Sequence, residues 1–181
     1  MHKFILTCVL IANHAFALEP AEIQNIAAQP HDRNNLIEAL AIYPDAREYR
    51  IIVKSGPSIA QLREGPPMQA KEKVVQGRYI VSEMKLPGME QPMIMVVTYD
   101  KATDAFKKWV LLPDNSIFSS TGVADIPRRT IAWSSDRPNG NPPVDVISIE
   151  THTDDKTIWK ETMLHDGNVT RIVHGTAHKT L

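Results

Sequence analysis

Beyond Pro44 the chain alternates short runs of β-branched, aromatic and aliphatic residues with breaks rich in Pro, Gly, Asn and Asp. This rhythm is typical of an all-β sandwich or barrel. The breaks are too short for helical crossovers, so neighbouring strands are expected to pair antiparallel. Ten strands are predicted, over residues 47–54, 70–75, 78–85, 93–99, 106–112, 116–123, 130–134, 144–152, 157–164 and 169–178.

The last predicted hairpin has the clearest turn. Asp166-Gly167 lies at the centre of the break, and Gly accepts the positive φ that a tight hairpin turn requires. Uninterrupted pairing outward from this turn places Trp159 opposite His174. One face then carries Trp159, Glu161, Met163, Ile172 and His174. Because that face mixes apolar and polar side chains, it suits a ligand-holding barrel, although a solid core with one satisfied polar residue explains it as well.

A helical pattern precedes the strands. Apolar residues recur at helical spacing between residues 20 and 43, with an interruption at Pro30-His31-Asp32. We therefore expect one or two short helices in a segment of residues 18–45. A single antiparallel barrel domain is expected to follow, over residues 46–181.

The first 17 residues have the layout of an export signal. Lys3 gives a positive start, residues 4–12 are almost entirely apolar, and Ala15-Phe16-Ala17 has the small-x-small pattern of a cleavage site. The apolar run is far shorter than the roughly 20 residues that span a bilayer. We expect cleavage after Ala17, a periplasmic or secreted bacterial protein, and no membrane span.

Composition and charge narrow the classes of partner. The 181 residues are 43% hydrophobic and 23% charged, which fits one soluble domain with a sizeable core. A net charge of −1 provides no basic excess for phosphates, which argues against a nucleic-acid partner. Cys8 is the only cysteine and lies in the predicted signal, so a disulfide scaffold is not expected.

The stretch from residue 76 to 179 resembles a bacterial family, the domain of unknown function 1579. The match begins with Val75-Gln76-Gly77-Arg78-Tyr79-Ile80 and continues with Val97-Thr98-Tyr99-Asp100. Its other residues are Phe106, Trp109, Gly122, Asp125 and the Asp166-Gly167 hairpin. The resemblance implies a lipocalin-like antiparallel β-barrel of about 8–10 strands, often exported and without an assigned activity. It identifies no functional residues.

Familiar catalytic motifs are missing: there is no Gly-x-Ser-x-Gly elbow, no phosphate loop and no dinucleotide fingerprint. No cofactor is expected. His174 and His178 would lie about 13 Å apart along a strand, too far to chelate one metal ion. Soft thioethers could bind copper(I), but adaptable core packing is the simpler role for the methionine cluster. That cluster contains Met84, Met89, Met93 and Met95.

The leading hypothesis is therefore an exported barrel that binds a small apolar or amphipathic molecule. The proposed lining is Trp109, Trp159, Glu161, Met163 and His174.

Two alternatives remain open. An envelope interaction protein with a packed barrel could dock through an edge strand or an apolar patch on its N-terminal helices. Residues for that patch are Ile23, Ile26, Leu36 and Leu40. An enzyme would need an acid–base pair, for which Glu161 with His174 and Glu150 with His152 are the candidates. A role without catalysis is favoured.

Overall fold

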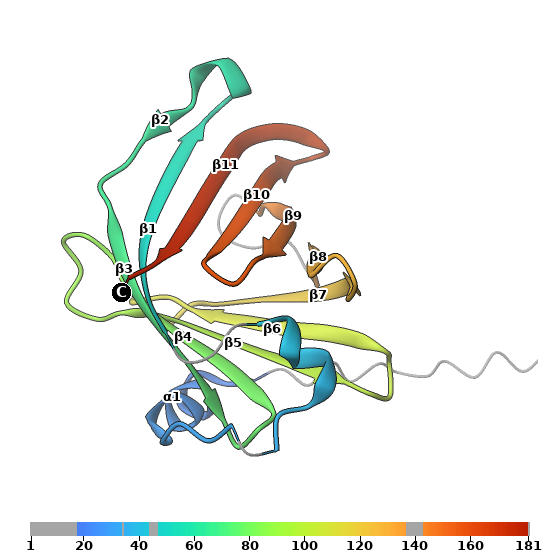
Figure 1. Cartoon of the computed structure of the whole chain (residues 1–181). Coiled ribbons are helices and arrows are strands. Elements are labelled where there is room, and N and C mark those ends of the chain that lie inside the picture. The colour runs from blue at the N-terminus through green and yellow to red at the C-terminus, as the bar shows by residue number, and fades with distance from the viewer. Residues whose placement is uncertain (1–17, 34, 44–46, 137–142, 181) are drawn as a thin grey trace, which may run out of the picture.

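The computed structural model describes residues 18–33, 35–43, 47–136 and 143–180 (Figure 1). The predicted signal peptide and its cleavage site after Ala17 lie outside the described residues. None of the helices in the described part is both long and apolar enough to cross a membrane.

A closed antiparallel barrel dominates the described chain. Ten strands each pair with their neighbour, and the last pairs with the first to close the sheet, while the two-residue strand β2 extends one edge of β1. The strands are β1 (Arg47–Gly56), β2 (Arg63–Glu64), β3 (Met68–Val75), β4 (Tyr79–Lys85), β5 (Met93–Asp100), β6 (Ala105–Leu111), β7 (Ile117–Asp125), β8 (Thr130–Ser135), β9 (Asp145–His152), β10 (Lys156–His165) and β11 (Asn168–Lys179). This architecture confirms the lipocalin-like barrel, and each predicted strand is present.

Sequence chemistry explains the best-predicted turn. Asp166 has φ 49° and Gly167 has φ 75°, so both residues of the β10–β11 turn adopt the left-handed backbone of a type I′ hairpin. Asp tolerates this conformation better than most residues, and Gly adopts it without steric cost. Strands β10 and β11 therefore form one long hairpin beside the seam where β11 pairs with β1 and closes the barrel.

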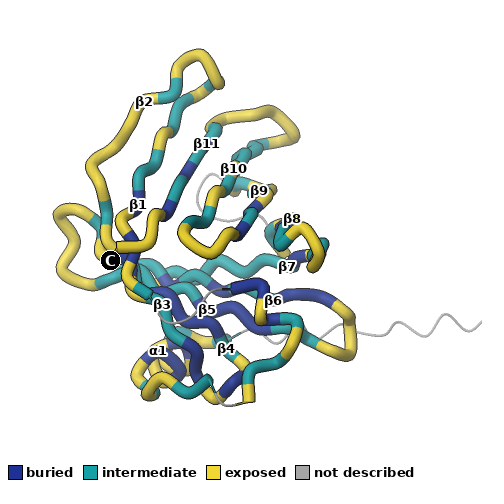
Figure 2. The backbone as a smooth tube through the Cα atoms, in the orientation of Figure 1, coloured by how far each residue is buried: buried dark blue, intermediate teal, exposed yellow. Residues whose placement is uncertain are grey.

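Helix α1 (Pro20–Ala28) packs against the outside of the barrel (Figure 1). The Glu22 carboxylate accepts a hydrogen bond of 2.8 Å from the backbone N–H of Glu19, and Pro20 begins the first turn. Ile23 and Ile26 are buried against outward side chains of β3 to β6. In Figure 2 the buried backbone is likewise concentrated on these strands, whereas β7 to β10 are mostly intermediate or exposed.

The short helix η1 (Glu38–Ile42) closes one end of the barrel. The chain before it is fixed to the β3–β4 turn, because Asp32 N–H donates to the Val74 carbonyl and Ile37 N–H donates to the Gly77 carbonyl, each at 2.8 Å. Leu40 and Tyr43 then bury their side chains inside the barrel. The interior cluster they join contains Val74, Ile80, Val97, Phe106, Ile131 and Trp133. One half of the barrel interior is therefore a solid core.

Candidate functional site

The other half of the barrel interior holds a cavity of about 520 Å³. Its walls are built from alternate residues of the strands, as the two-residue period of a β-strand requires. The residues nearest the open strand ends are apolar: Val53, Met68, Leu86, Leu112, Val144 and Met163. Deeper positions are polar or charged, including Tyr49, Glu72, Lys108, Glu150, His152 and Thr157. The cavity is thus apolar at its mouth and polar at its floor.

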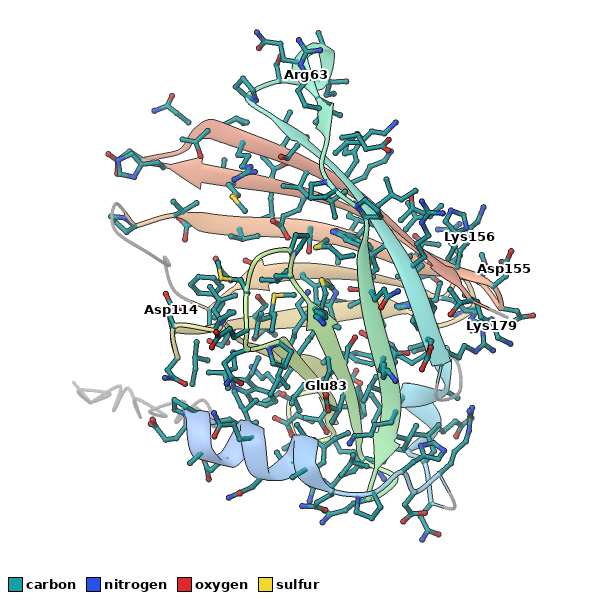
Figure 3. The ribbon with its side chains drawn as sticks, turned by 90° about the vertical axis from the view of Figure 1, so that its left-hand side faces the viewer. Arg63, Glu83, Asp114, Asp155, Lys156 and Lys179 are labelled. Carbon is teal, nitrogen blue, oxygen red and sulfur yellow. The ribbon has the colours of Figure 1, made fainter. Side chains whose placement is uncertain are left out.

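Figure 3 shows the two ends of the barrel. Asp114, in the β6–β7 turn, lies at the open end, while Asp155, Lys156 and Lys179 lie together at the opposite end. Lys179 N–H donates to the Asp155 carbonyl there at 2.9 Å, which joins the C-terminal strand to the β9–β10 turn. Backbone hydrogen bonding therefore stabilises the closed end of the barrel in addition to the apolar core.

Glu150 and His152 form the centre of the polar floor. They are two residues apart on β9, so both side chains point inward, and Glu150 Oε1 lies 2.8 Å from His152 Nε2. The other ring nitrogen, Nδ1, lies 3.0 Å from Thr157 Oγ1 on β10. The ring of Tyr43 packs 4.4 Å from the His152 ring, centroid to centroid. A carboxylate, an imidazole and a hydroxyl therefore lie in series inside the barrel, although the contact between His152 Nε2 and Glu150 lacks the geometry of a hydrogen bond.

Lys108 supplies a cation to the same cluster. Its Nζ lies 4.0 Å from Glu150 Oε2 and 4.1 Å above the ring of Trp133. Burial lowers the pKa of Lys108, although Glu150 and Glu161 act in the opposite direction. For Glu150, burial raises the pKa, but interactions with His152 and Lys108 outweigh it and bring the pKa to about 2. These neighbours therefore keep the Glu150 carboxylate ionised despite its burial.

Glu72 and Tyr49 are a second polar group on the floor. The Tyr49 hydroxyl and the Glu72 carboxyl are close enough to shift each other's pKa, but neither Tyr49 Oη nor Glu72 Oε1 has a hydrogen bond of normal geometry among the described residues. Burial raises the pKa of Glu72 to about 8, and the nearby charge of Glu150 adds to the effect. Arg47 acts in the opposite direction. The pKa of Tyr49 is raised as well, first by burial and then by Glu72. In contrast to Glu150, Glu72 lacks sufficient positive charge around it.

Three of the predicted lining residues face the cavity: Trp159, Glu161 and Met163. They alternate along β10 as expected. Burial raises the pKa of Glu161, while Lys108 and Arg171 act to lower it. Because Glu161 pairs with Val173 and Ser148, its carboxylate has mostly uncharged neighbours on the adjacent strands.

Trp109 does not line the cavity. It is buried on the outer face of β6, where it packs with Ile23 and Ile26 of α1. The strand period explains this position, because Lys108 and Val110 on either side of Trp109 face inward. The sequence pattern correctly predicts that Trp109 lies in a strand, but it does not reveal that α1 covers this residue.

His174 does not line the cavity either, because the predicted register of the last hairpin is wrong. Leu164 pairs with Val169 as expected, but a bulge follows and Met163 pairs with Arg171. The extra residue is Thr170, whose hydroxyl donates to the Met163 carbonyl at 3.2 Å. A shift of one residue moves every later side chain to the other face. His174 therefore lies opposite Lys160 on the outside, and Ile172 faces outward with it.

This register also separates the predicted acid–base pair Glu161 and His174, since one faces the cavity and the other faces outward. The second predicted pair, Glu150 and His152, is the one brought together. Tyr49, Glu72 and Lys108 also belong to the floor and were not predicted from the sequence. The sequence signal for such a residue is a charged or phenolic side chain on a strand face whose other residues are apolar. Lys108, between Phe106 and Val110 on one face of its strand, is an example.

The methionines of the predicted cluster divide between two environments. Met84, Met93 and Met95 line the cavity, whereas Met89 is 53% exposed in the β4–β5 loop. No group of three or more His, Cys, Asp or Glu side chains within the described ranges is arranged to hold a metal ion. The cavity-facing thioethers form flexible apolar walls.

The apolar patch proposed for partner docking on the N-terminal segment is not exposed. Ile23 and Leu40 are fully buried, and Ile26 is nearly so. Leu36 is partly buried against the interior cluster. The segment uses its apolar residues to cover the barrel wall and close one end, so these residues do not support the interaction hypothesis.

Compared with known proteins, the chain matches no family model and no curated protein sequence.

Proposed function

We propose that this protein is an exported barrel that binds one small amphipathic molecule in its open half. The observation that carries the proposal is the cavity of about 520 Å³, which lies in the usual range for small-molecule sites, about 300–1,000 Å³. Its apolar mouth would cover the hydrocarbon part of a ligand. Its polar floor would bind the head.

The packing of the barrel supports this reading over a filled barrel without a ligand. The closed half contains a continuous apolar core that stabilises the fold. Tyr49 Oη and Glu72 Oε1 are buried without a hydrogen-bond partner in the described chain, as are Tyr43 Oη and Trp133 Nε1 in the closed half. Buried polar atoms without partners cost free energy. Of these residues, Tyr49 and Glu72 line the cavity, so a molecule bound there can supply the missing partner.

Export and family membership are part of the proposal. The first 17 residues have the pattern of a signal peptide, and the motifs around residues 75–80, 97–109 and 166–167 resemble domain of unknown function 1579. Export is tested by expressing the full chain in a bacterium and sequencing the N-terminus of the periplasmic product. Leu18 is the expected first residue, and a product confined to the cytosol that retains Met1 would contradict export.

Ligand binding is tested with N-phenyl-1-naphthylamine, an uncharged dye that fluoresces in apolar sites. Wild type should bind it, and Ser148→Phe should not, because Ser148 lies on the cavity wall. Ser134→Phe is the matched control, since Ser134 is exposed on the outside of β8. Far-ultraviolet circular dichroism confirms that both variants fold. Dye binding that is equal in wild type and Ser148→Phe would place the dye elsewhere and remove the proposal.

A second candidate function, acid–base catalysis on a bound amphiphile, is favoured by one observation. The series Glu150, His152 and Thr157 lies within hydrogen-bonding distance inside the cavity. A panel of nitrophenyl esters with alkyl chains tests it, with His152→Gln as the inactive variant. Ester hydrolysis that is unchanged in His152→Gln, or absent in wild type, would argue against this candidate.

A further inference from the structure

We infer that the polar floor selects a ligand with a cationic head, such as an alkylammonium, whose charge is placed beside Glu72. This inference rests on the proposed function and specifies its ligand class. It follows from the charges on the floor and from the buried polar atoms there that lack a hydrogen-bond partner, which include Tyr49 Oη and Glu72 Oε1.

The charges of the floor do not balance. Three carboxyl groups, Glu72, Glu150 and Glu161, line the cavity together with one lysine, Lys108. The Lys108 ammonium lies 4.0 Å from Glu150 and is therefore paired with that carboxylate, which His152 also contacts. Within the described residues Glu72 has no ion-pair partner at that distance. A bound cation would give Glu72 the charged partner that it lacks without displacing any existing pair.

The groups that face Glu72 leave room for this cation. On β1, Arg47 lies opposite Glu72 in register, but its guanidinium donates to the backbone carbonyl of Asp154. On β4 the opposite residue is Ser82, which carries no charge. Tyr49 on β1 and Glu150 on β9 are the remaining titratable neighbours. Tyr49 Oη and one carboxylate oxygen of Glu72 can both accept a hydrogen bond from an ammonium group.

The apolar part of the ligand would follow the cavity toward its mouth. Trp159 and Met95 line the middle of the path, and Met68 and Met163 lie near the open strand ends. An alkyl chain would bury its surface against these side chains. An anionic head would instead be placed beside Glu72 and Glu161, where like charges repel it.

The pH dependence of binding gives the inference a specific signature. Because the pKa of Glu72 is about 8, Glu72 is mostly protonated at pH 6 and mostly ionised at pH 9. An alkylammonium remains charged over this range, as a lysine side chain does. Its affinity should therefore rise with pH, and binding near neutral pH should release a proton from Glu72.

The test is isothermal titration calorimetry of the purified protein with decylamine, decanol and decanoate at pH 6 and pH 9. We expect decylamine to bind most tightly at pH 9, about tenfold more tightly than decanol. Glu72→Gln should reduce decylamine affinity by about tenfold at pH 9 and have little effect at pH 6. Glu83→Gln is the matched control, because Glu83 is on the outer face of β4 and pairs with Lys73 at 3.8 Å.

The outcomes separate the ligand class from the proposed function. If decanol or decanoate binds as tightly as decylamine at pH 9, the cavity binds amphiphiles but the cationic preference is wrong. A decylamine affinity that does not rise with pH in wild type overturns the preference without any variant. If none of the three compounds binds, both the preference and the proposed function fail.

Discussion

The indole of Trp159 lies directly against Gly175 on the neighbouring strand. A Cβ atom at Gly175 would be 2.0 Å from Trp159 Cζ2, which is far inside van der Waals contact. The two residues are opposite each other in the β10–β11 register. Gly175 therefore provides the space in which the indole forms part of the cavity wall.

We predict that Gly175→Ala displaces the indole and lowers the free energy of unfolding by about 1–3 kcal/mol, as overpacking does elsewhere. Tryptophan fluorescence should shift, and urea denaturation measures the loss of stability. Gly65→Ala is the control, because its Cβ would meet only the Val53 carbonyl oxygen at 3.7 Å. Equal stability of both variants would show that the indole moves aside without cost.

Glu72→Gln should stabilise the protein at high pH. The pKa of Glu72 is about 8 in the folded protein against an ordinary value of 4.5, so the folded state retains a proton that the unfolded state has released. Between these two values the free energy of unfolding falls as pH rises. At pH 9 the variant should be more stable by about 2 kcal/mol, with no gain at pH 4. Urea denaturation at both pH values measures this, and a gain at pH 4 would contradict the account.

Glu150→Gln should have the opposite effect. The folded pKa of Glu150 is about 2 against an ordinary 4.5, so the carboxylate stabilises the fold above pH 4.5 and loses this contribution as pH falls toward 2. Removing it leaves Lys108 and His152 without their buried partner and should cost about 3 kcal/mol at pH 7.

The deficit of Glu150→Gln should shrink between pH 5 and pH 2, as followed by thermal unfolding. The control is Glu64→Gln, whose carboxylate is exposed and lies 3.5 Å from Lys54. That surface pair should contribute at most about 1 kcal/mol. A deficit of Glu150→Gln that does not change with pH would show that the loss is due to packing and not to charge.

Gly77→Ala should displace the segment before η1 from the β3–β4 turn. Gly77 has φ 60°, and a Cβ there would be 2.5 Å from the backbone of Asn35. The matched control Gly88→Ala has a similar φ of 77° but open space around the added atom. The control should lose about 1–2 kcal/mol from backbone strain alone, and Gly77→Ala at least about 3 kcal/mol because of the added clash. Amide hydrogen exchange at Ile37 should also accelerate in Gly77→Ala alone, and equal effects of both variants would contradict the docking role.

The barrel could be predicted from sequence because its signals are local. Alternation and breaking residues identify each strand, and Asp166-Gly167 identifies a tight turn from two residues. The bulge at Thr170 has no comparable signal, since it inserts one ordinary residue into a regular strand. That single residue reverses the orientation of His174 and removes it from the predicted site.

The polar floor could be predicted only in part, because it is assembled by the closure of the barrel. The pair Glu150 and His152 was recognisable from their spacing on one strand. Tyr49, Glu72 and Lys108 come from three other strands, and the pattern of one strand does not reveal which neighbours will share its interior level. Helix α1 likewise covers Trp109 through contacts between distant parts of the chain.

The most direct test of the central claim uses the methionine methyl groups as reporters. Met68, Met84, Met93, Met95 and Met163 line the cavity, whereas Met89 is exposed in a loop. Nuclear magnetic resonance spectra of methyl-labelled methionine should be recorded during titration with decylamine. We predict saturable shifts of the cavity methyl signals with the Met89 signal unchanged. Shifts confined to Met89, or no saturable shift of any cavity methyl, would contradict a ligand site inside the barrel.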